Sequence, residues 1–519
     1  MLSPAATRET DNLAAWTTRL LILSLVGIFF LTLFPFRIVL HAKGGIPGFP
    51  FLLGGWGKSG GAFDDFLNVL LFIPFGFAMG GKFRRRAKSG LETILRALAA
   101  GALLSYTVEF LQLYIPLRDS GWTDVITNGS GAGVGSFLFL LSGDTVLQLL
   151  SAGESGLTRI LTWRWAAIIT ALYFALWCAI SVPLQMHTRL SNWNSDTLLI
   201  VGNDVGGRPS TAWQGDLFRL ELWDRPLSPK LVRELHDGNG SQAGQTGLLA
   251  DYDFSRPAKF SDRQGFLPDL FWASNSSGRV EPSKLVLDGQ SWLASRGSID
   301  GAAAAIQKTN QFAIRVICRA AQGAESDGRI VGIWGRNGEM DLRIRQDGNT
   351  LVFWFLNPLS VTRSDLVWHI RDVFEGGRVR DIVFSYDGSD AFLYLDGAQK
   401  NGTYRLGPGM AMARIFHSVG TSEMDGYNDV YYFLVFFPGG ILAGLAARRI
   451  AAGTFRAMWF FVGAILAPAA LVEMTLVSVS GRPISFFYLT LSVTLAVAGC
   501  VWINIGTKIN AAPNEAPFY

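Results

Sequence analysis

The sequence predicts a multi-domain protein in which an α-helical transmembrane bundle carries an inserted all-β jelly-roll or sandwich domain. Composition is the first observation: 49% of the 519 residues are apolar, 17% are charged, and the mean hydropathy is +0.28. A soluble domain has about 25% charged residues, so this balance favours lipid. The second observation is that long apolar runs near both ends enclose a middle segment of short alternating stretches.

Spanning helices are predicted wherever about 20 mostly apolar residues follow one another. The candidates are 18–38, 65–81, 93–115, 122–142, 165–183, 429–446, 457–478 and 483–505. The first is predicted to be a retained helix, because residues 1–16 are polar and no cleavage site of small residues follows.

Short basic clusters orient the spans. The tract 82–88 follows the second candidate span, and Arg448 and Arg449 follow the sixth. Under the positive-inside rule these loops and both termini are cytoplasmic, which places the middle segment outside the cell membrane. Basic residues distributed in this way, with a net charge of only +4, do not indicate nucleic-acid binding.

The expected domain organisation follows from these spans. It comprises a cytoplasmic N-terminus (1–16), a first membrane repeat (17–142), a cytoplasmic linker (143–164), a fifth span (165–183), an extracytoplasmic β domain (184–428), spans six to eight (429–505) and a cytoplasmic tail (506–519). We call the spans within 17–142 the first block, and the spans within 165–183 and 429–505 the second block. Each block has four spans, an even number, so the two are predicted to be parallel repeats.

The two blocks resemble each other at a constant shift of 364 residues (429 − 65). The shift pairs Asp65 with Asp429, Glu109 with Glu473, and Arg118 with Arg482. Unrelated apolar helices seldom share ionisable residues, because such residues are rare within membranes. The shift therefore predicts an internal duplication.

A dense set of polar residues lies in the first block. The set is Asp65, Asn68, Glu109, Gln112, Arg118, Asp124 and Asn128. Spacings of three and four residues place neighbouring members on one helix face. Ionisable groups at membrane depth face a cavity or one another, so we expect a polar pocket with Arg118 positioned for an anionic headgroup. The alternative is an interhelical hydrogen-bond network that only stabilises the bundle.

The second block keeps part of this set. Asp429, Glu473 and Arg482 remain, but Tyr432, Leu476, Tyr488 and Ser492 stand at the positions of Asn68, Gln112, Asp124 and Asn128. The shared residues are predicted to be structural, and those unique to the first block to carry any activity. The glycine-rich stretch 129–135 is predicted to be a close-packing helix surface, since no strand precedes it and no lysine follows, as a phosphate-binding loop requires.

These residues carry a family resemblance. In order, they read Asp65, Asn68, Phe72, Pro74 and Gly76; Val108, Glu109 and Gln112; Pro116 and Arg118; Asp124 and Asn128. Their order and spacing resemble the VanZ-like family of bacterial membrane proteins over about 17–142. The resemblance implies a cell-envelope setting and a connection to antibiotic resistance, but no reaction. The second block, at about 165–505, resembles a degenerate copy.

The middle segment reads as a β domain. Apolar alternation in 312–318, 351–355 and 383–397, with Asp-Gly turns, indicates short antiparallel strands. The stretches 383–397 and 201–228 resemble the concanavalin A-like lectin/glucanase family, particularly its laminin-G-type members. The resemblance implies carbohydrate binding, and a circularly permuted order, because the stretch that usually closes such a domain comes first.

An enzymatic β domain is not expected. Glucanases of this fold carry an E-x-D-x-x-E strand, in which two carboxylates on one strand face serve as nucleophile and general acid. The chain has Glu339 and Asp341 but no third carboxylate after them. Four tryptophans are predicted to lie in the core of the sandwich, with stacking on sugar rings as the alternative: Trp193, Trp213, Trp334 and Trp354. Three aspartates are predicted to form turns, with calcium binding as the alternative: Asp387, Asp390 and Asp396. No cofactor or metal motif is readable.

The sequence therefore predicts a bacterial cell-envelope protein of the inner membrane, in contact with lipid. Its β domain is expected to bind a glycan or partner, and its first block to hold a polar pocket. The alternatives are a transporter or handler of a lipid-linked or anionic envelope component, and a membrane enzyme using Glu109 and Asp124. A pathway through both blocks would favour transport, and a pocket confined to the first block would favour binding or catalysis.

Overall fold

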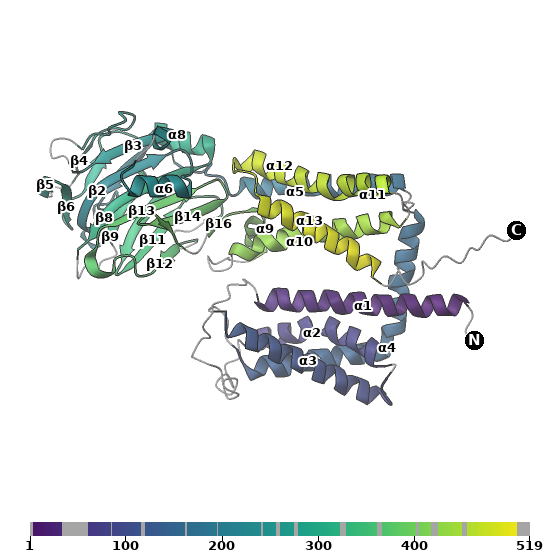
Figure 1. Ribbon diagram of the computed structural model, residues 1–519. Coiled ribbons are helices and arrows are strands. Elements are labelled where there is room, and N and C mark those ends of the chain that lie inside the picture. The colour runs from purple at the N-terminus through teal and green to yellow at the C-terminus, as the bar shows by residue number, and fades with distance from the viewer. Residues whose placement is uncertain are drawn as a thin grey trace. The chain divides into compact units, whose positions relative to one another are not determined.

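The computed structural model covers the whole chain (Figure 1). It describes residues 4–33, 61–84, 86–115, 120–160, 163–194, 196–239, 242–255, 260–273, 279–321, 328–360, 366–400, 404–416, 424–448 and 454–505.

Within these residues, eight helical segments are long and apolar enough to cross a membrane. The helices are α1 (Pro4–Leu33), α2 (Ala62–Phe83), α3 (Gly90–Gln112), α4 (Trp122–Ile160), α5 (Trp163–Met186), α10 (Met424–Ala447), α11 (Thr454–Phe461), α12 (Ala467–Ser480) and α13 (Phe486–Asn504). A π-helical turn, η5 (Val462–Leu466), joins α11 to α12 into one spanning segment, 458–480. The chain is therefore a multi-pass membrane protein, as the sequence predicts.

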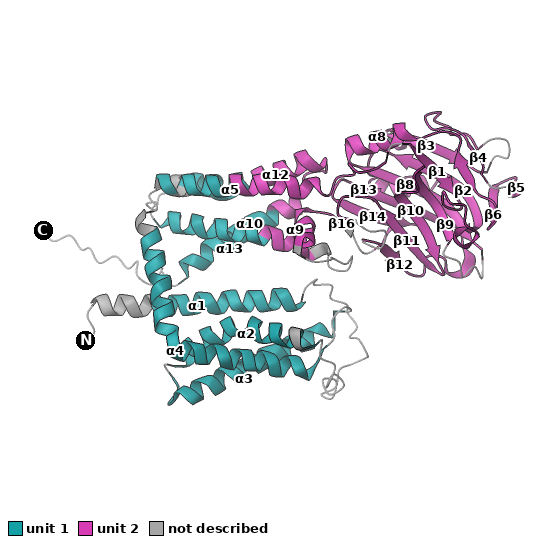
Figure 2. Cartoon of the chain, turned by 180° about the vertical axis from the view of Figure 1, so that it is seen from behind, with its two compact units in different colours: residues 1–174, 433–469, 490–519 teal, residues 175–432, 470–489 magenta. Residues whose placement is uncertain are grey.

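The chain divides into two compact units (Figure 2). Unit 1 comprises 1–174, 433–469 and 490–519, and unit 2 comprises 175–432 and 470–489. The helices α1–α4 thus lie in unit 1, and the β strands lie in unit 2 together with parts of α5, α10, α12 and α13.

Close approach of α2 and α4 depends on glycine. A Cβ atom at Gly76 would collide with the carbonyl oxygen of Ala132, and one at Gly135 would collide with that of Ile73. Gly131 faces the carbonyl of Val69 in the same way. The glycine-rich stretch is confirmed as a helix-packing surface, of the kind that small residues form in membranes.

The helix α4 continues to Ile160, through the residues expected to form a linker. Glu154 in this extension accepts a 2.7 Å hydrogen bond from Arg19 Nη1 of α1 and pairs with Arg448 beyond the end of α10. Arg448 Nε also donates to Asn504 Oδ1 of α13 at 2.8 Å. Arg19 is buried, Glu154 and Arg448 are half-buried, and the cluster links residues more than 130 positions apart in the sequence.

The β domain is a sandwich of two antiparallel sheets. The first has the order β12 (Trp368–Ile370), β11 (Thr350–Phe355), β10 (Met340–Asp347), β9 (Gly328–Gly335), β1 (Thr197–Val201), β7 (Leu293–Ser295) and β4 (Leu270–Trp272). The second has the order β15 (Ala398–Gln399), β14 (Asp390–Leu395), β13 (Arg380–Tyr386), β8 (Phe312–Ala320), β2 (Gln214–Trp223), β6 (Lys284–Asp288) and β5 (Arg279–Glu281). In addition, β3 (Leu248–Asp253) pairs with β2, and β16 (Tyr404–Arg405) pairs with β14.

Aromatic rings from both sheets form the core of the sandwich. Phe353 of β11 stacks on Phe384 of β13 with 3.7 Å between ring centroids, and Phe312 of β8 packs edge-on against Phe355. Such contacts between inner faces are what hold two sheets together. The segment 214–223, which the resemblance places at a domain end, forms β2 between β8 and β6.

Short helices complete the β domain. They are α6 (Pro229–His236), α7 (Gln242–Gln245) and α8 (Asp300–Thr309), with 3₁₀ turns at Pro209–Thr211 and Glu375–Gly377. After the last strand, α9 (Pro408–Phe416) packs against α10, where Gly409 N–H donates to Asn428 Oδ1 at 3.0 Å (Figure 1). On the outer face of the second sheet, Arg315 Nη1 donates to Glu221 at 2.9 Å, and its Nε and Nη2 donate to Asp381 at 2.8 Å. Each of these three charges is buried, and each is paired, which is the condition for burying charge.

Candidate functional site

A cavity of about 710 Å³ lies among the helices of the first block. It is lined by Leu31, Thr32, Leu67, Asn68, Leu70, Leu71, Pro74, Glu109, Gln112, Asp124 and Asn128. These residues bring together polar groups that lie up to 96 positions apart in the chain, from Thr32 to Asn128 (128 − 32). The cavity combines a polar interior with a leucine-rich rim.

Hydrogen bonds join three helices at the polar interior. Asn68 Nδ2 on α2 donates to Asp124 Oδ1 on α4 at 2.8 Å. Ser105 Oγ on α3 donates to the carbonyl of Asp124 at 3.3 Å and accepts from Asn128 Nδ2 at 2.8 Å. The Asn68 amide thus orients the Asp124 carboxylate, while Ser105 and Asn128 are linked to the Asp124 backbone carbonyl.

Glu109 and Gln112 form the α3 side of the cavity. Glu109 is only 2% exposed, and its Oε2 accepts from the backbone N–H of Gly121 at 3.0 Å, just before α4 begins. Gln112 Nε2 donates to the carbonyl of Thr32 at the end of α1, at 2.9 Å. These bonds fix the ends of α1, α3 and α4 around one space.

Asp65 lies one helical turn before Asn68 and close enough to Asp124 for the two carboxylates to repel each other. Its Oδ1 atom is buried and, among the described residues, has no hydrogen-bond partner. Arg118, with Pro116, lies outside the described residues, so its place in the site rests on the sequence.

Five of the seven residues selected from the sequence therefore line one cavity: Asn68, Glu109, Gln112, Asp124 and Asn128. Sequence reasoning missed Ser105, which bridges Asp124 and Asn128. The signal was present, because Ser105 stands four residues before Glu109 and so shares its helix face.

In the second block, two of the ionisable residues singled out from the sequence form an ion pair. Glu473 and Arg482 form a buried pair of two parallel bonds, 2.7 Å and 2.6 Å long. Glu473 Oε1 also accepts from the backbone N–H of Ser485 at 2.7 Å. Asp429 lies half-buried on α10. The sequence had predicted a structural role for these residues.

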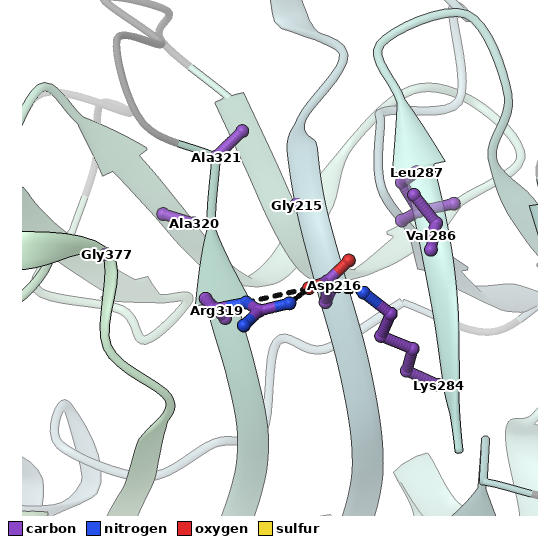
Figure 3. Close-up of a pocket in the computed structure, with 9 residues that line it drawn as sticks. All are labelled: Gly215, Asp216, Lys284, Val286, Leu287, Arg319, Ala320, Ala321 and Gly377. Atoms are coloured by element: carbon purple, nitrogen blue, oxygen red, sulfur yellow. Dashed lines mark hydrogen bonds and ion pairs between the residues drawn. The ribbon is translucent and has the colours of Figure 1, made fainter. Parts of the chain in front are cut away.

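A second cavity, of about 400 Å³, lies on the β domain (Figure 3). Asp216 of β2 stands between Lys284 of β6 and Arg319 of β8, and one carboxylate oxygen accepts from Lys284 Nζ at 3.1 Å and Arg319 Nε at 2.8 Å. Gly215 and Gly377 line the same cavity without side chains that would fill it. Lys284 also pairs with Glu281 of β5 at 3.3 Å, so the cavity wall carries both cationic and anionic groups.

The carboxylates considered for hydrolysis in the β domain do not share a cavity with these residues. Asp341 is fully buried and accepts from the backbone N–H and Nδ2 of Asn194, at 3.1 Å and 2.8 Å. Burial raises the pKa of Asp341 to about 7. Glu339 accepts from Asn337 Nδ2 in the adjoining turn. Asp341 therefore anchors the segment that enters the domain.

The four tryptophans considered as sugar platforms are core residues. Trp193, Trp213, Trp334 and Trp354 are each at most 4% exposed. The turn aspartates also serve the backbone: Asp387 Oδ1 accepts from the N–H groups of Ser389 and Asp390, at 2.9 Å and 2.7 Å. Within the described residues, no cluster of three metal-ligating side chains occurs.

Fold and site together define a multi-pass membrane protein with a polar cavity in its first four helices and a separate β-sandwich. A family model described as VanZ/LLP1 matches residues 9–143, the part of the chain that contains this cavity. The match supports the VanZ-like resemblance of the first block. No curated protein and no solved structure matches the chain.

Proposed function

We propose that the first block binds the headgroup of an anionic, lipid-like component of the bacterial cell envelope. The observation that carries this proposal is the composition of the 710 Å³ cavity, which joins buried polar groups to a rim of exposed leucines. Leu31, Leu67 and Leu70 are 55%, 43% and 50% exposed. A headgroup with a hydrocarbon chain has the same division between polar and apolar parts.

The polar groups define what the headgroup would offer. Glu109 and Asp124 accept hydrogen bonds from hydroxyl or ammonium groups. The amides of Asn68, Gln112 and Asn128 can both donate and accept hydrogen bonds. Arg118, placed by the sequence beside this set, would pair with a phosphate or carboxylate. The chain of the ligand would lie along the leucine rim.

The cavity would open toward the outer side of the membrane. It lies where α1 and α3 end and where α2 and α4 begin, which is one side of an alternating bundle. If the basic tract 82–88 is cytoplasmic, that side is extracytoplasmic, as is the β domain. The proposal therefore places both candidate sites in the same compartment.

A membrane enzyme is the second candidate, because Glu109 and Asp124 line the same cavity and could serve as acid and base. Transport is less well supported, because every residue that lines the cavity belongs to the first block. A pathway through both blocks would need residues of the second block on its wall.

We propose further that the two blocks are parallel copies. The 364-residue shift relates contacts as well as residues. Gly440 meets the carbonyl of Ala496 as Gly76 meets that of Ala132, and Gly499 meets the carbonyl of Phe437 as Gly135 meets that of Ile73. The bond from Ser485 N–H to Glu473 is likewise the counterpart of the bond from Gly121 N–H to Glu109.

For the β domain we propose binding of an acidic envelope glycan, supported by the charged cavity at Asp216. Arg319→Ala should weaken binding of the full-length protein in detergent to an acidic polysaccharide, such as polygalacturonate, at least fivefold. Lys230→Ala, a change of an exposed lysine on α6 away from the cavity, is the matched control. Equal binding by both variants would remove this cavity from the proposal.

Native mass spectrometry tests the membrane proposal. The purified protein should bind a polyprenyl phosphate or phosphatidylglycerol, and Asn128→Ala should weaken that binding at least tenfold because it removes a donor from the cavity network. Ser492→Ala alters the position equivalent to Asn128 in the second block and should leave binding unchanged. If Asn128→Ala binds as tightly as Ser492→Ala, the cavity is not the headgroup site.

A further inference from the structure

We infer that the second block is a closed copy of the first, in which the counterpart of the pocket is filled and the adjoining turn has become the mount of the β domain. This inference builds on the proposed duplication and assigns the second block a role that the first does not have. Every contact on which it depends lies within unit 2, which comprises 175–432 and 470–489.

Two tyrosines fill the position of the pocket. Tyr432 and Tyr488 stand 364 residues after Asn68 and Asp124, the two residues that share a hydrogen bond in the first block. Their rings stack with centroids 4.6 Å apart and an angle of 12° between planes. Both rings are buried, at 2% and 6% exposure. Leu476, at the position of Gln112, is also buried, so an aromatic and aliphatic packing replaces the polar network.

The ion pair of the second block fixes a turn. Arg482 and Glu473 bond through two parallel contacts, and the Glu473 carboxylate also accepts from the N–H of Ser485. Gly481 adopts a left-handed φ of 76° within this turn. With Arg482 and Ser485 both bonded to Glu473, the turn 480–485 presents its backbone carbonyls in fixed positions.

The β domain binds those carbonyls. Asn310 Nδ2 donates to the carbonyl of Ser480 and Gln311 Nε2 to that of Gly481, each at 2.6 Å. Asn310 ends α8 with a left-handed φ of 58°, and its Oδ1 accepts from the N–H of Leu190 at 2.8 Å. One side chain therefore joins α8, the segment that follows α5, and the turn between α12 and α13.

A glycine allows this close approach. Gly388, in the turn between β13 and β14, has a φ of 100°, and a Cβ atom there would lie 2.6 Å from the carbonyl oxygen of Ser480. Arg482 is also close enough to Asp387 and Asp390, in the same β-turn region, for charge attraction. The mount is thus complementary in shape and charge, and it orients the β domain without a ligand.

Cysteine accessibility tests the closure of the second block. In a full-length protein whose three native cysteines are replaced, Leu476→Cys should react with a small maleimide at least tenfold more slowly than Gln112→Cys, its counterpart in the open cavity. Adding Tyr488→Ala should bring the Leu476→Cys rate close to that of Gln112→Cys. Fast reaction of Leu476→Cys alone, or no acceleration by Tyr488→Ala, would overturn the inference. Slow reaction of Gln112→Cys would instead contradict the open pocket of the proposed function.

Spin-label distances test the mount. Labels at Lys230→Cys on the β domain and Met474→Cys on α12, both exposed positions, should give a narrow distance distribution in the full-length protein. Asn310→Ala combined with Gln311→Ala should at least double its width while the protein stays folded by circular dichroism. Thr309→Ala, a neighbouring change whose hydroxyl bonds only within its own segment, is the control. An unchanged width in the double variant would overturn the mount.

Discussion

Glu109 and Glu473, which lie 364 residues apart, each accept from a backbone N–H group just before the next helix begins. Glu473 neutralises the buried Arg482, whose side chain is 5% exposed. Glu109 holds the start of α4 and lines the open cavity. Among the described contacts, Glu473 thus closes a buried ion pair and Glu109 forms part of a cavity wall.

Replacing these glutamates should therefore give different defects. Glu473→Gln leaves Arg482 buried without its counter-charge and should destabilise the protein by about 3–5 kcal/mol. Glu109→Gln keeps an oxygen that can accept from Gly121 and should instead lower headgroup binding at near-normal abundance. Membrane abundance and binding per molecule, measured together, separate the two effects. Equal loss of binding per molecule in both variants would mean that the blocks share one site.

Asp341 should make the β domain sensitive to pH. Because burial raises its pKa to about 7, the folded domain keeps a proton that the unfolded chain releases above about pH 4. Stability is then greatest below pH 4 and falls as the pH rises toward 7. Hydrogen exchange of β1 and β10 in the full-length protein should report this loss, and Asp341→Asn should reduce it. A rise in protection between pH 5 and 7 that Asp341→Asn removes would contradict the assignment.

At the scale of elements, the pairing of α2 with α4 positions Asn68 against Asp124. The glycines that allow this approach are readable in the sequence, but the atoms they meet are not. Gly135→Ala places a methyl group against the carbonyl of Ile73 and should cost about 1–3 kcal/mol.

Gly153→Ala is the control for that change, because nothing lies within 4 Å of a Cβ atom at Gly153. Alanine is the better helix former, so this variant should be neutral or stabilising. Thermal melting in detergent compares the two. Equal melting temperatures would show that α2 and α4 do not approach as closely as described.

Much of the helical architecture was predictable because apolar length alone marks a spanning segment. The pocket residues were predictable in part from spacings of three and four residues. These spacings place Asn68, Gln112 and Asn128 on the same helix faces as the carboxylates that precede them. The Arg19–Glu154–Arg448 cluster was not predictable, because its members pair across long sequence separations and no local pattern marks them. The sequence shows that Tyr432 and Tyr488 stand at the positions of polar residues in the first block. It does not show that their rings stack, because residue spacing within one helix does not determine packing between two helices.

At the scale of the whole molecule, the membrane topology decides whether the two candidate sites face the same compartment. Reporter fusions after residues 88 and 450 should be cytoplasmic, and a fusion near residue 300 should be extracytoplasmic, because basic loops remain inside. Alkaline phosphatase and green fluorescent protein fusions make this measurement. A cytoplasmic signal near residue 300 would place the β domain away from any envelope glycan.

Photo-crosslinking tests the central claim, that the first block alone binds an envelope amphiphile, most directly. Leu70 and Leu434 are related by the 364-residue shift and are 50% and 40% exposed, so both are expected to meet lipid. A benzophenone amino acid at position 70 should capture a phosphate-containing amphiphile in native membranes, and Asp124→Asn should abolish that adduct. At position 434 the adduct should be absent. The same adducts at both positions, unaffected by Asp124→Asn, would reduce the cavity to ordinary lipid contact and contradict the account.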